Sequence, residues 1–391
     1  WILFYLLLIS TVFIAFGFLY RISIISYFLI FTYIELIDKT YYLNHYYFIS
    51  LLSFILIFLP LHRKFSLDTY FGICKRLTHT QSWTINAIKL QIGIVYFFAG
   101  VAKLNYHWLF EAQPMINWLK HQSDFPIFGK LMLKDYTAYL FSWVGALFDL
   151  TIFFILINKR YRIFGYILVV IFHAMTSIMF PIGVFPLVMI CTTLIFFSET
   201  FHSKVIDFVS KLTLKSKAKV TDSIYSLNKI GKPLIQTVLI SFFVLQLLLP
   251  FRYLLYPGKL FWTEQGYRFS WRVMLIEKTG YAEFYIHETL KDRKKLIQNK
   301  DYLTPQQEKM MATQPDMILQ FAKHISTLYK DSVFISNSGE AINFGNIPKV
   351  TANVKVCLFN TGSRDFVKEG TNLSKEKRGF NNKKWIIPYE E

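Results

Sequence analysis

Long apolar segments recur through the first two thirds of this 391-residue chain, and they constrain its fold more than any other feature. Several approach the roughly 20 residues that a helix needs to cross a bilayer. The first segment has neither a basic leader nor a cleavage-like end, so we interpret it as a membrane helix whose upstream residues are missing, not as a signal peptide. We expect eight transmembrane helices, at residues 1–20, 22–37, 47–60, 83–104, 136–157, 162–180, 182–198 and 233–253.

The positive charges sort by loop. The net charge is +18, and most cations fall in alternate loops, at Arg21 and within residues 63–76, 159–162 and 204–232. The intervening loops hold only four lysines, Lys39, Lys120, Lys130 and Lys134. By the positive-inside rule the cation-rich loops face the cytoplasm, and the 203–232 loop can attract anionic lipid. The cations form no nucleic-acid motif, so we predict a lipid bilayer and no nucleic acid as the partner.

This orientation brings two titratable residues to one membrane depth. His45 stands just before the third span, at its outer end, and Lys103 closes the fourth span on the same side, so both can line one pocket. His173 lies in the outer half of the sixth span, before a break at 181–183, and interrupted helices usually border a cavity. A lysine held out of water can act as a base.

Each of these three residues also has a structural interpretation. Lys103 can snorkel to the interface as an anchor, and His45 can belong to an interfacial belt of tyrosines. His173 can be a core histidine that bonds a neighbouring helix.

The character of the chain changes from Phe251 onward. Charged residues rise, and short β-like runs occur at 281–286, 333–336 and 353–359. A helical pattern covers 305–329, with Thr304 as N-cap and Glu308 completing a capping-box spacing. We therefore expect a transmembrane domain over residues 1–253 and an extracytoplasmic α+β domain over residues 254–391.

Familiar motifs of soluble enzymes are absent from the sequence. It contains no Walker loop, Rossmann fingerprint, HExxH or CxxC. The histidines lack the spacing of metal ligands, so we expect no metal site.

Several segments carry a collinear pattern along nearly the whole chain. They are 38–45 with Asn44 and His45, 91–104 with Tyr-Phe-x-Ala-Gly-x-x-Lys-Leu, 172–175, 183–185, 246–250, and 267–274 with Ser270 and Trp271. Together these segments resemble the vitamin K-dependent γ-glutamyl carboxylase family, in a bacterial-type form with an HTTM-like transmembrane domain.

The resemblance implies that oxidation of a quinol drives a carboxylation. A lysine base, matching Lys103, deprotonates vitamin K hydroquinone, which is here a menaquinol-type cosubstrate. Oxygen then adds, and the strongly basic product removes a γ-hydrogen from a peptide glutamate, after which the carbanion captures CO2. A quinone reductase is the indirect partner that this chemistry implies. Localisation in a bacterial inner membrane is expected.

The resemblance also assigns roles to individual residues. His45 matches a histidine that stabilises or relays charge, and Asn44 is its hydrogen-bonding neighbour. The remaining residues expected to bind the quinol or the peptide are His173, Phe185, Tyr267, Ser270 and Trp271. Trp271 either packs against ligand or peptide, or anchors its segment at the membrane interface.

The chain also departs from the family pattern. Ala102 replaces the first of two paired lysines, Arg272 stands where an acidic residue is usual in the animal enzymes, and Ile276 replaces a histidine. Two alternatives therefore stay open. One is a quinol epoxidase that carboxylates no peptide, and the other is a transporter or structural membrane protein on the same scaffold.

Overall fold

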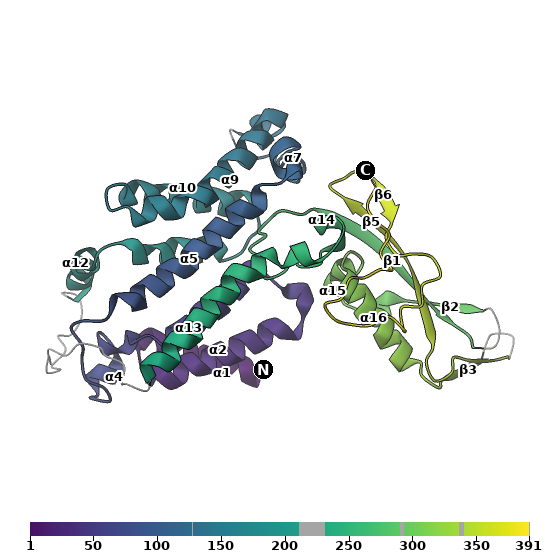
Figure 1. The fold of residues 1–391 in the computed structure, drawn as a ribbon, viewed down its shortest axis with the longest axis horizontal. Coiled ribbons are helices and arrows are strands. Elements are labelled where there is room, and N and C mark those ends of the chain that lie inside the picture. The colour runs from purple at the N-terminus through teal and green to yellow at the C-terminus, as the bar shows by residue number, and fades with distance from the viewer. Residues whose placement is uncertain (127, 211–230, 290–292, 336–339, 391) are drawn as a thin grey trace. The chain divides into compact units, whose positions relative to one another are not determined.

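The computed structural model describes residues 1–126, 128–210, 231–289, 293–335 and 340–390, and the chain divides into two compact units (Figure 1). The first unit comprises Trp1–Glu111, Trp118–Pro250 and Trp271–Val273, and the second comprises Ala112–Asn117, Phe251–Ser270 and Met274–Glu391. Most of the lysine-rich loop, at 211–230, and Ser336 of an expected strand lie outside the described residues.

The first unit is built from helices. Those of membrane length are α2 (Tyr20–Ile37), α5 (Ser82–Lys103), α9 (Asp135–Ile157), α10 (Arg162–Met179) and α13 (Gly231–Leu248), which a 3-10 turn extends to Leu255. The shorter α-helices of this unit are α1 (Ile2–Phe16), α3 (Asn44–Ile57), α4 (Leu67–Tyr70), α6 (Tyr106–Phe110), α8 (Gly129–Met132), α11 (Phe185–Thr193) and α12 (Glu199–Ser210). Helix α7 (Met115–Lys120) is divided, with Met115–Asn117 in the second unit. Single 3-10 turns are η1 (Lys39–Tyr41), η2 (Leu61–Arg63) and η3 (Leu194–Phe196).

The expected count of eight spans is not supported. Five described helices are long and apolar enough to cross a membrane, and the number becomes six if α11, η3 and α12 are one bent span. The apolar segments at 1–20 and 47–60 do form helices, α1 and α3, but these have 15 and 14 residues. At about 1.5 Å per residue they reach about 22 and 21 Å, less than a hydrocarbon core of roughly 30 Å.

Local backbone signals explain why hydropathy overestimates these helices. Gly17 adopts φ 62°, a left-handed conformation that suits glycine, and it ends α1. In the seventh expected span, α11 ends after nine residues and the chain turns by 114° into α12. Apolar composition continues across both points, so a hydropathy average does not detect them.

Helix α5 packs closely against α9, and it also contacts α3 and α13 (Figure 1). Two glycines allow the approach to α9. A Cβ atom at Gly93 would lie 2.4 Å from Phe153, and one at Gly100 would lie 2.7 Å from Leu150. Small residues at such contacts let membrane helices come close together. The approach brings the end of α5, one turn beyond Gly100, against the middle of α9.

The second unit is an α+β fold, as expected. Its four-stranded antiparallel sheet has the order β2 (Lys294–Ile297), β1 (Lys278–His287), β5 (Lys349–Leu358) and β6 (Ser363–Asp365). Strands β3 (Val333–Ile335) and β4 (Ala341–Asn343) pair separately. The helices of this unit are α14 (Leu260–Thr263), α15 (Pro305–Met311) and α16 (Pro315–Leu328), with a 3-10 turn at η5 (Asn299–Asp301). The 3-10 turn that follows α13, η4 (Leu249–Leu255), begins in the first unit and ends in the second.

Alternating burial along the strands forms the core of this unit. Ala282, Phe284 and Ile286 of β1 are buried, as the period of two in a half-covered strand requires. Helix α16 covers this face, and Phe321 meets Phe284 edge to face with ring centroids 4.8 Å apart.

The helix expected at 305–329 is two helices. Pro315 lacks a backbone N–H and restricts the residue before it, so the chain breaks after Met311 and starts again as α16. The capping box at Thr304 is present, but its partner is Gln307 and not Glu308. The three-residue spacing places Gln307 where its side chain returns to the N-cap backbone.

Candidate functional site

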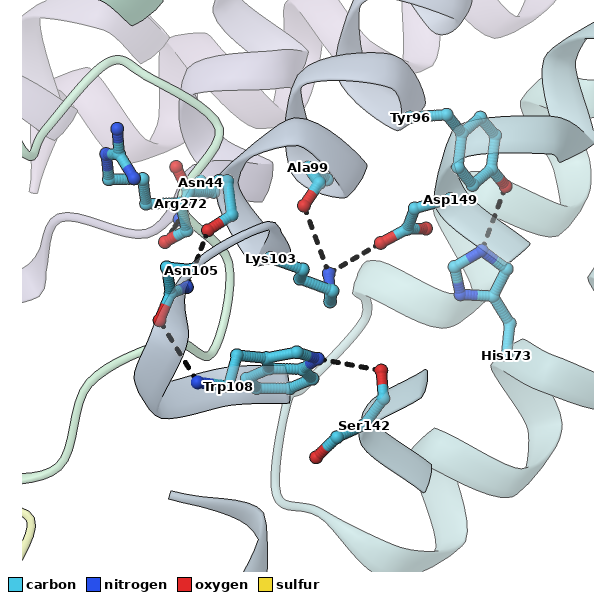
Figure 2. A network of polar contacts seen from close by, with 11 residues as sticks. Asn44, Tyr96, Ala99, Lys103, Asn105, Trp108, Ser142, Asp149, His173 and Arg272 are labelled. Carbon is cyan, nitrogen blue, oxygen red and sulfur yellow. Dashed lines mark hydrogen bonds and ion pairs between the residues drawn. The ribbon is translucent and has the colours of Figure 1, made fainter. Parts of the chain in front are cut away.

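Lys103, the last residue of α5, forms a buried ion pair with Asp149 in the middle of α9 (Figure 2). The distance from Lys103 Nζ to Asp149 Oδ2 is 2.6 Å, and the two residues are 7% and 5% exposed. Charged groups inside a bilayer are costly, and they persist where they pair with one another. Lys103 therefore does not snorkel into solvent as a simple anchor.

A short segment after α5 encloses the ammonium group. Asn105 accepts a hydrogen bond from the backbone N–H of Trp108 at 3.0 Å and caps α6, while the Trp108 indole N–H donates to the Ser142 carbonyl at 2.7 Å. These bonds hold the Trp108 ring 5.5 Å from Lys103 Nζ, within the range of a cation–π contact. The ion pair is thus bounded by α5, α9 and an indole ring.

A second polar contact lies farther back along α5. The Tyr96 hydroxyl lies 2.9 Å from Nε2 of His173 on α10, and both residues are buried (Figure 2). The other ring nitrogen of His173, Nδ1, has no hydrogen-bond partner among the described residues. A buried polar atom without a partner is uncommon and marks a place where a ligand or water can bind.

Phe185 connects His173 with His45. Its ring centroid lies 5.8 Å from that of His45 and 5.9 Å from that of His173. Phe148 also packs edge-on against His173, at 6.3 Å. The structure therefore brings three of the residues expected from the sequence into one aromatic cluster, which adjoins Tyr96.

Asn44 and Trp271 form a neighbouring group at the start of α3. The side-chain amide of Asn44 donates to the Arg272 carbonyl at 3.2 Å. Trp271 is 1% exposed and stacks on Tyr47 with ring centroids 4.9 Å apart. Tyr47 in turn donates to the Gln246 side chain of α13 at 3.1 Å. These bonds tie residues 271–273 to α3.

The comparisons with known families identify the architecture. The model of the HTTM domain matches residues 1–201, just over half of the chain, and the model of the vitamin K-dependent gamma-carboxylase lumenal domain matches residues 231–391. This chain belongs to the HTTM-containing, vitamin K-dependent gamma-carboxylase-like family. No solved structure matches it significantly.

Family membership confirms the coarse expectations. This carboxylase-like chain is a multi-pass membrane protein with an extracytoplasmic C-terminal region, since its apolar helices precede the part that matches a lumenal domain. The bacterial inner membrane remains a prediction.

Tyr267 and Ser270 lie in the second unit of this carboxylase-like chain. The Ser270 hydroxyl donates to the Tyr267 carbonyl, and Ser270 is buried. The Tyr267 ring meets Phe261 at 6.3 Å. Tyr267 and Ser270 therefore contact each other. Their assignment to substrate binding stays a prediction.

Asp149 is the residue that sequence reasoning missed. It stands inside the apolar segment 136–157, where an acidic residue by itself indicates a functional site or a buried ion pair. Tyr96 was missed as a partner of His173 for a different reason, because the two residues lie on separate helices and no spacing links them.

A second buried lysine occurs in the C-terminal unit. Lys278 Nζ lies 3.0 Å from Glu264 and donates to the Trp262 carbonyl at 2.7 Å. Burial lowers the pKa of Lys278, and the Glu264 carboxylate opposes this effect. Since both groups are satisfied within the fold, we interpret this pair as structural.

Metal ligands do not cluster in the part of the chain that the structure describes, where no three His, Cys, Asp or Glu side chains come together. The expectation of a metal-free reaction stays a prediction.

Proposed function

We propose that this protein couples oxygenation of a menaquinol-type vitamin K hydroquinone to γ-carboxylation of glutamate in a peptide or protein. O2 and CO2 are the other substrates, and the epoxide of the quinone is the second product. The observation that carries the proposal is the buried Lys103–Asp149 pair, at a lysine of the segment that resembles the family's catalytic segment, in a chain that matches both family models.

We assign to Lys103 the role of accepting the proton of the quinol. Lys103 is the last residue of α5, and its ammonium nitrogen lies beside the Trp108 indole ring and the Asp149 carboxylate. The residue is buried, so little water reaches this nitrogen. Exclusion of water protects a strongly basic species from being quenched. A side-chain base is too weak to remove a γ-hydrogen from glutamate. Oxidation of the bound hydroquinone supplies the driving force for this step.

The aromatic cluster fits a flat, partly polar ring. Phe185 and Phe148 offer apolar ring faces, and the unpartnered Nδ1 of His173 offers one polar contact to a ring oxygen. His45 stacks on Phe185 at 5.8 Å and is the residue to which we assign stabilisation of negative charge on the deprotonated quinol. A positively charged imidazolium, or the positive end of an imidazole N–H dipole, would stabilise this negative charge.

The protein partners follow from the same chemistry. A peptide with accessible glutamates is the proposed carboxylation substrate, and Tyr267 and Ser270 are proposed to contribute to its binding. A quinone reductase is needed to regenerate the hydroquinone, and the bacterial inner membrane is the proposed location. We propose residues 1–253 as the domain of quinol chemistry and 254–391 as the outer domain.

The test uses the purified full-length chain in lipid nanodiscs. The protein receives menaquinol, O2, 13C-bicarbonate and a glutamyl peptide, and mass spectrometry measures quinone epoxide and γ-carboxyglutamate in the same sample. The proposal predicts both products, with peptide carboxylation dependent on the quinol. Epoxide without labelled peptide indicates a quinol epoxidase, and the absence of both products contradicts the proposal.

A further inference from the structure

Asp149 has a geometry that constrains how Lys103 can act. Its carboxylate lies 2.6 Å from the lysine nitrogen, the distance of a charge-assisted hydrogen bond between an ammonium and a carboxylate. An ammonium group has no lone pair and cannot accept a proton. If Lys103 takes a proton from the quinol, it must first transfer one of its own.

We propose that Asp149 receives this proton, so that the Lys103–Asp149 pair and not Lys103 alone is the base. This inference rests on the proposed function. Asp149 acts through Lys103 and is a positioning residue, whereas Lys103 contacts the quinol.

The step balances in atoms and charge. One N–H bond of the Lys103 ammonium breaks, and its proton forms an O–H bond with Asp149. The neutral amine then accepts the hydroxyl proton of the quinol, whose O–H bond breaks while a new N–H bond forms. The products are a protonated Asp149, a Lys103 ammonium and a deprotonated quinol. No electrons are transferred, and the total charge is zero before and after the step.

The packing supports Asp149 as the acceptor. It is the only carboxylate that forms an ion pair with Lys103 within the described ranges, and the Tyr96 hydroxyl is already engaged with His173. The close contact between Gly100 and Leu150, next in sequence to Asp149, fixes the distance between the two helices at this point. A pair held at 2.6 Å needs no rearrangement to transfer a proton.

The pair leaves the quinol anion beside a cation. After the step Lys103 is charged and Asp149 is neutral, so the ammonium is free to stabilise the negative charge on the quinol. A lysine acting alone reaches the same charge state only if it begins without its proton. Removal of the carboxylate should therefore slow epoxidation if the pair is the base, and should leave its rate unchanged or raise it if Lys103 acts alone.

The first measurement follows Asp149 without any quinol. Infrared spectra of the full-length chain in nanodiscs are recorded for the wild type, Lys103→Met and the double variant Lys103→Met/Asp149→Asn. A buried carboxylate without a counter-charge takes up a proton. We therefore expect the carbonyl band of a carboxylic acid to appear in Lys103→Met and to be absent from the wild type and the double variant. Absence of this band from the Lys103→Met spectrum would overturn the proposal.

The second measurement follows quinol epoxidation in Asp149→Asn and Asp149→Glu. We expect a loss of roughly 100-fold or more in Asp149→Asn, in the range of a lost acid–base function. Asp149→Glu, which retains a carboxylate, should recover part of the rate. Thermal unfolding of all variants identifies any that fail to fold, and the infrared result on Lys103→Met does not depend on them.

The outcomes separate this inference from the proposed function. A wild-type rate or a faster rate in Asp149→Asn shows that Lys103 acts alone and overturns the inference, while the proposed function stands. An inactive wild-type protein overturns the proposed function and, with it, the role of Asp149.

Discussion

The Tyr96 hydroxyl lies 2.9 Å from Nε2 of His173 and connects α5 to α10 inside the helical unit. This bond fixes the orientation of the His173 ring, with Phe148 and Phe185 packed edge-on against it. The direction of Nδ1, the second ring nitrogen, is then fixed as well. Because Nδ1 has no hydrogen-bond partner among the described residues, it is available to a polar atom of a ligand.

Substitution of His173 and Tyr96 distinguishes ligand binding from packing. His173→Phe removes both ring nitrogens, whereas Tyr96→Phe removes only the hydrogen bond, at a cost of about 1 kcal/mol in stability. We expect His173→Phe to raise KM for the quinol several-fold more than Tyr96→Phe does. Tyr166→Phe, which lies on the same helix α10, is the matched control. Equal losses of stability with an unchanged KM would identify His173 as a core histidine.

Cysteine labelling tests the orientation in the membrane. Ser123 and Lys159 are exposed and lie in loops that the positive-inside rule assigns to opposite sides. In a background without native cysteines, we expect an impermeant maleimide to label Ser123→Cys in intact cells and Lys159→Cys only after permeabilisation. Labelling of Lys159→Cys in sealed cells would reverse the orientation.

Replacement of Trp271 tests whether this residue anchors or binds. Because it is almost fully buried against Tyr47, we expect Trp271→Ala to lower stability by about 3–5 kcal/mol and to reduce both activities together. Trp271→Phe keeps an aromatic ring and should retain most of the stability. A selective loss of peptide carboxylation at normal stability would instead show that Trp271 recognises substrate.

The stability of the helical unit should depend on the pH through His62. Burial lowers the pKa of His62 from 6.5 to about 4, Arg21 and Arg63 add to the effect, and Asp68 opposes it. Between these values the unfolded chain binds a proton that the folded chain does not, so stability decreases as the pH falls from 6.5 to 4. The decrease is at most about 1.4 kcal/mol per pH unit.

The His62 ring stacks on Tyr20 with centroids 5.0 Å apart. His62→Phe provides the control, because it replaces the imidazole with an aromatic ring that does not titrate. We expect the Tm of this variant to vary less with pH than that of the wild type over the same window. Parallel curves for the two proteins would show that His62 does not titrate in this way.

The sequence was sufficient to predict the class of fold, because apolar segments and a later change to alternating strands are local patterns. Strand β1 and strand β5 lie where the runs at 281–286 and 353–359 indicated. The number of spans was not predictable in the same way. Helix ends depend on single residues such as Gly17, which an average over 20 residues conceals.

The same holds for the candidate site, where single residues could be recognised from their segments but contacts between helices could not. Lys103 was recognisable because it ends an apolar segment, and its burial agrees with an intramembrane role. Its pairing with Asp149 depends on the close packing of α5 and α9 at Gly93 and Gly100, which the order of residues does not reveal. Partners on different helices become known only when the helices are packed.

Epoxide formation in Lys103→Ala and Lys103→Arg measures directly whether Lys103 takes the quinol proton. Lys89→Ala is the matched control, since Lys89 lies on the same helix and contacts the Phe196 ring. We predict that both Lys103 variants lose epoxidation while the control retains it, and that a small added amine partly restores Lys103→Ala. Arginine fails because its guanidinium stays protonated. Epoxidation at the wild-type rate in either Lys103 variant would show that Lys103 is not the base.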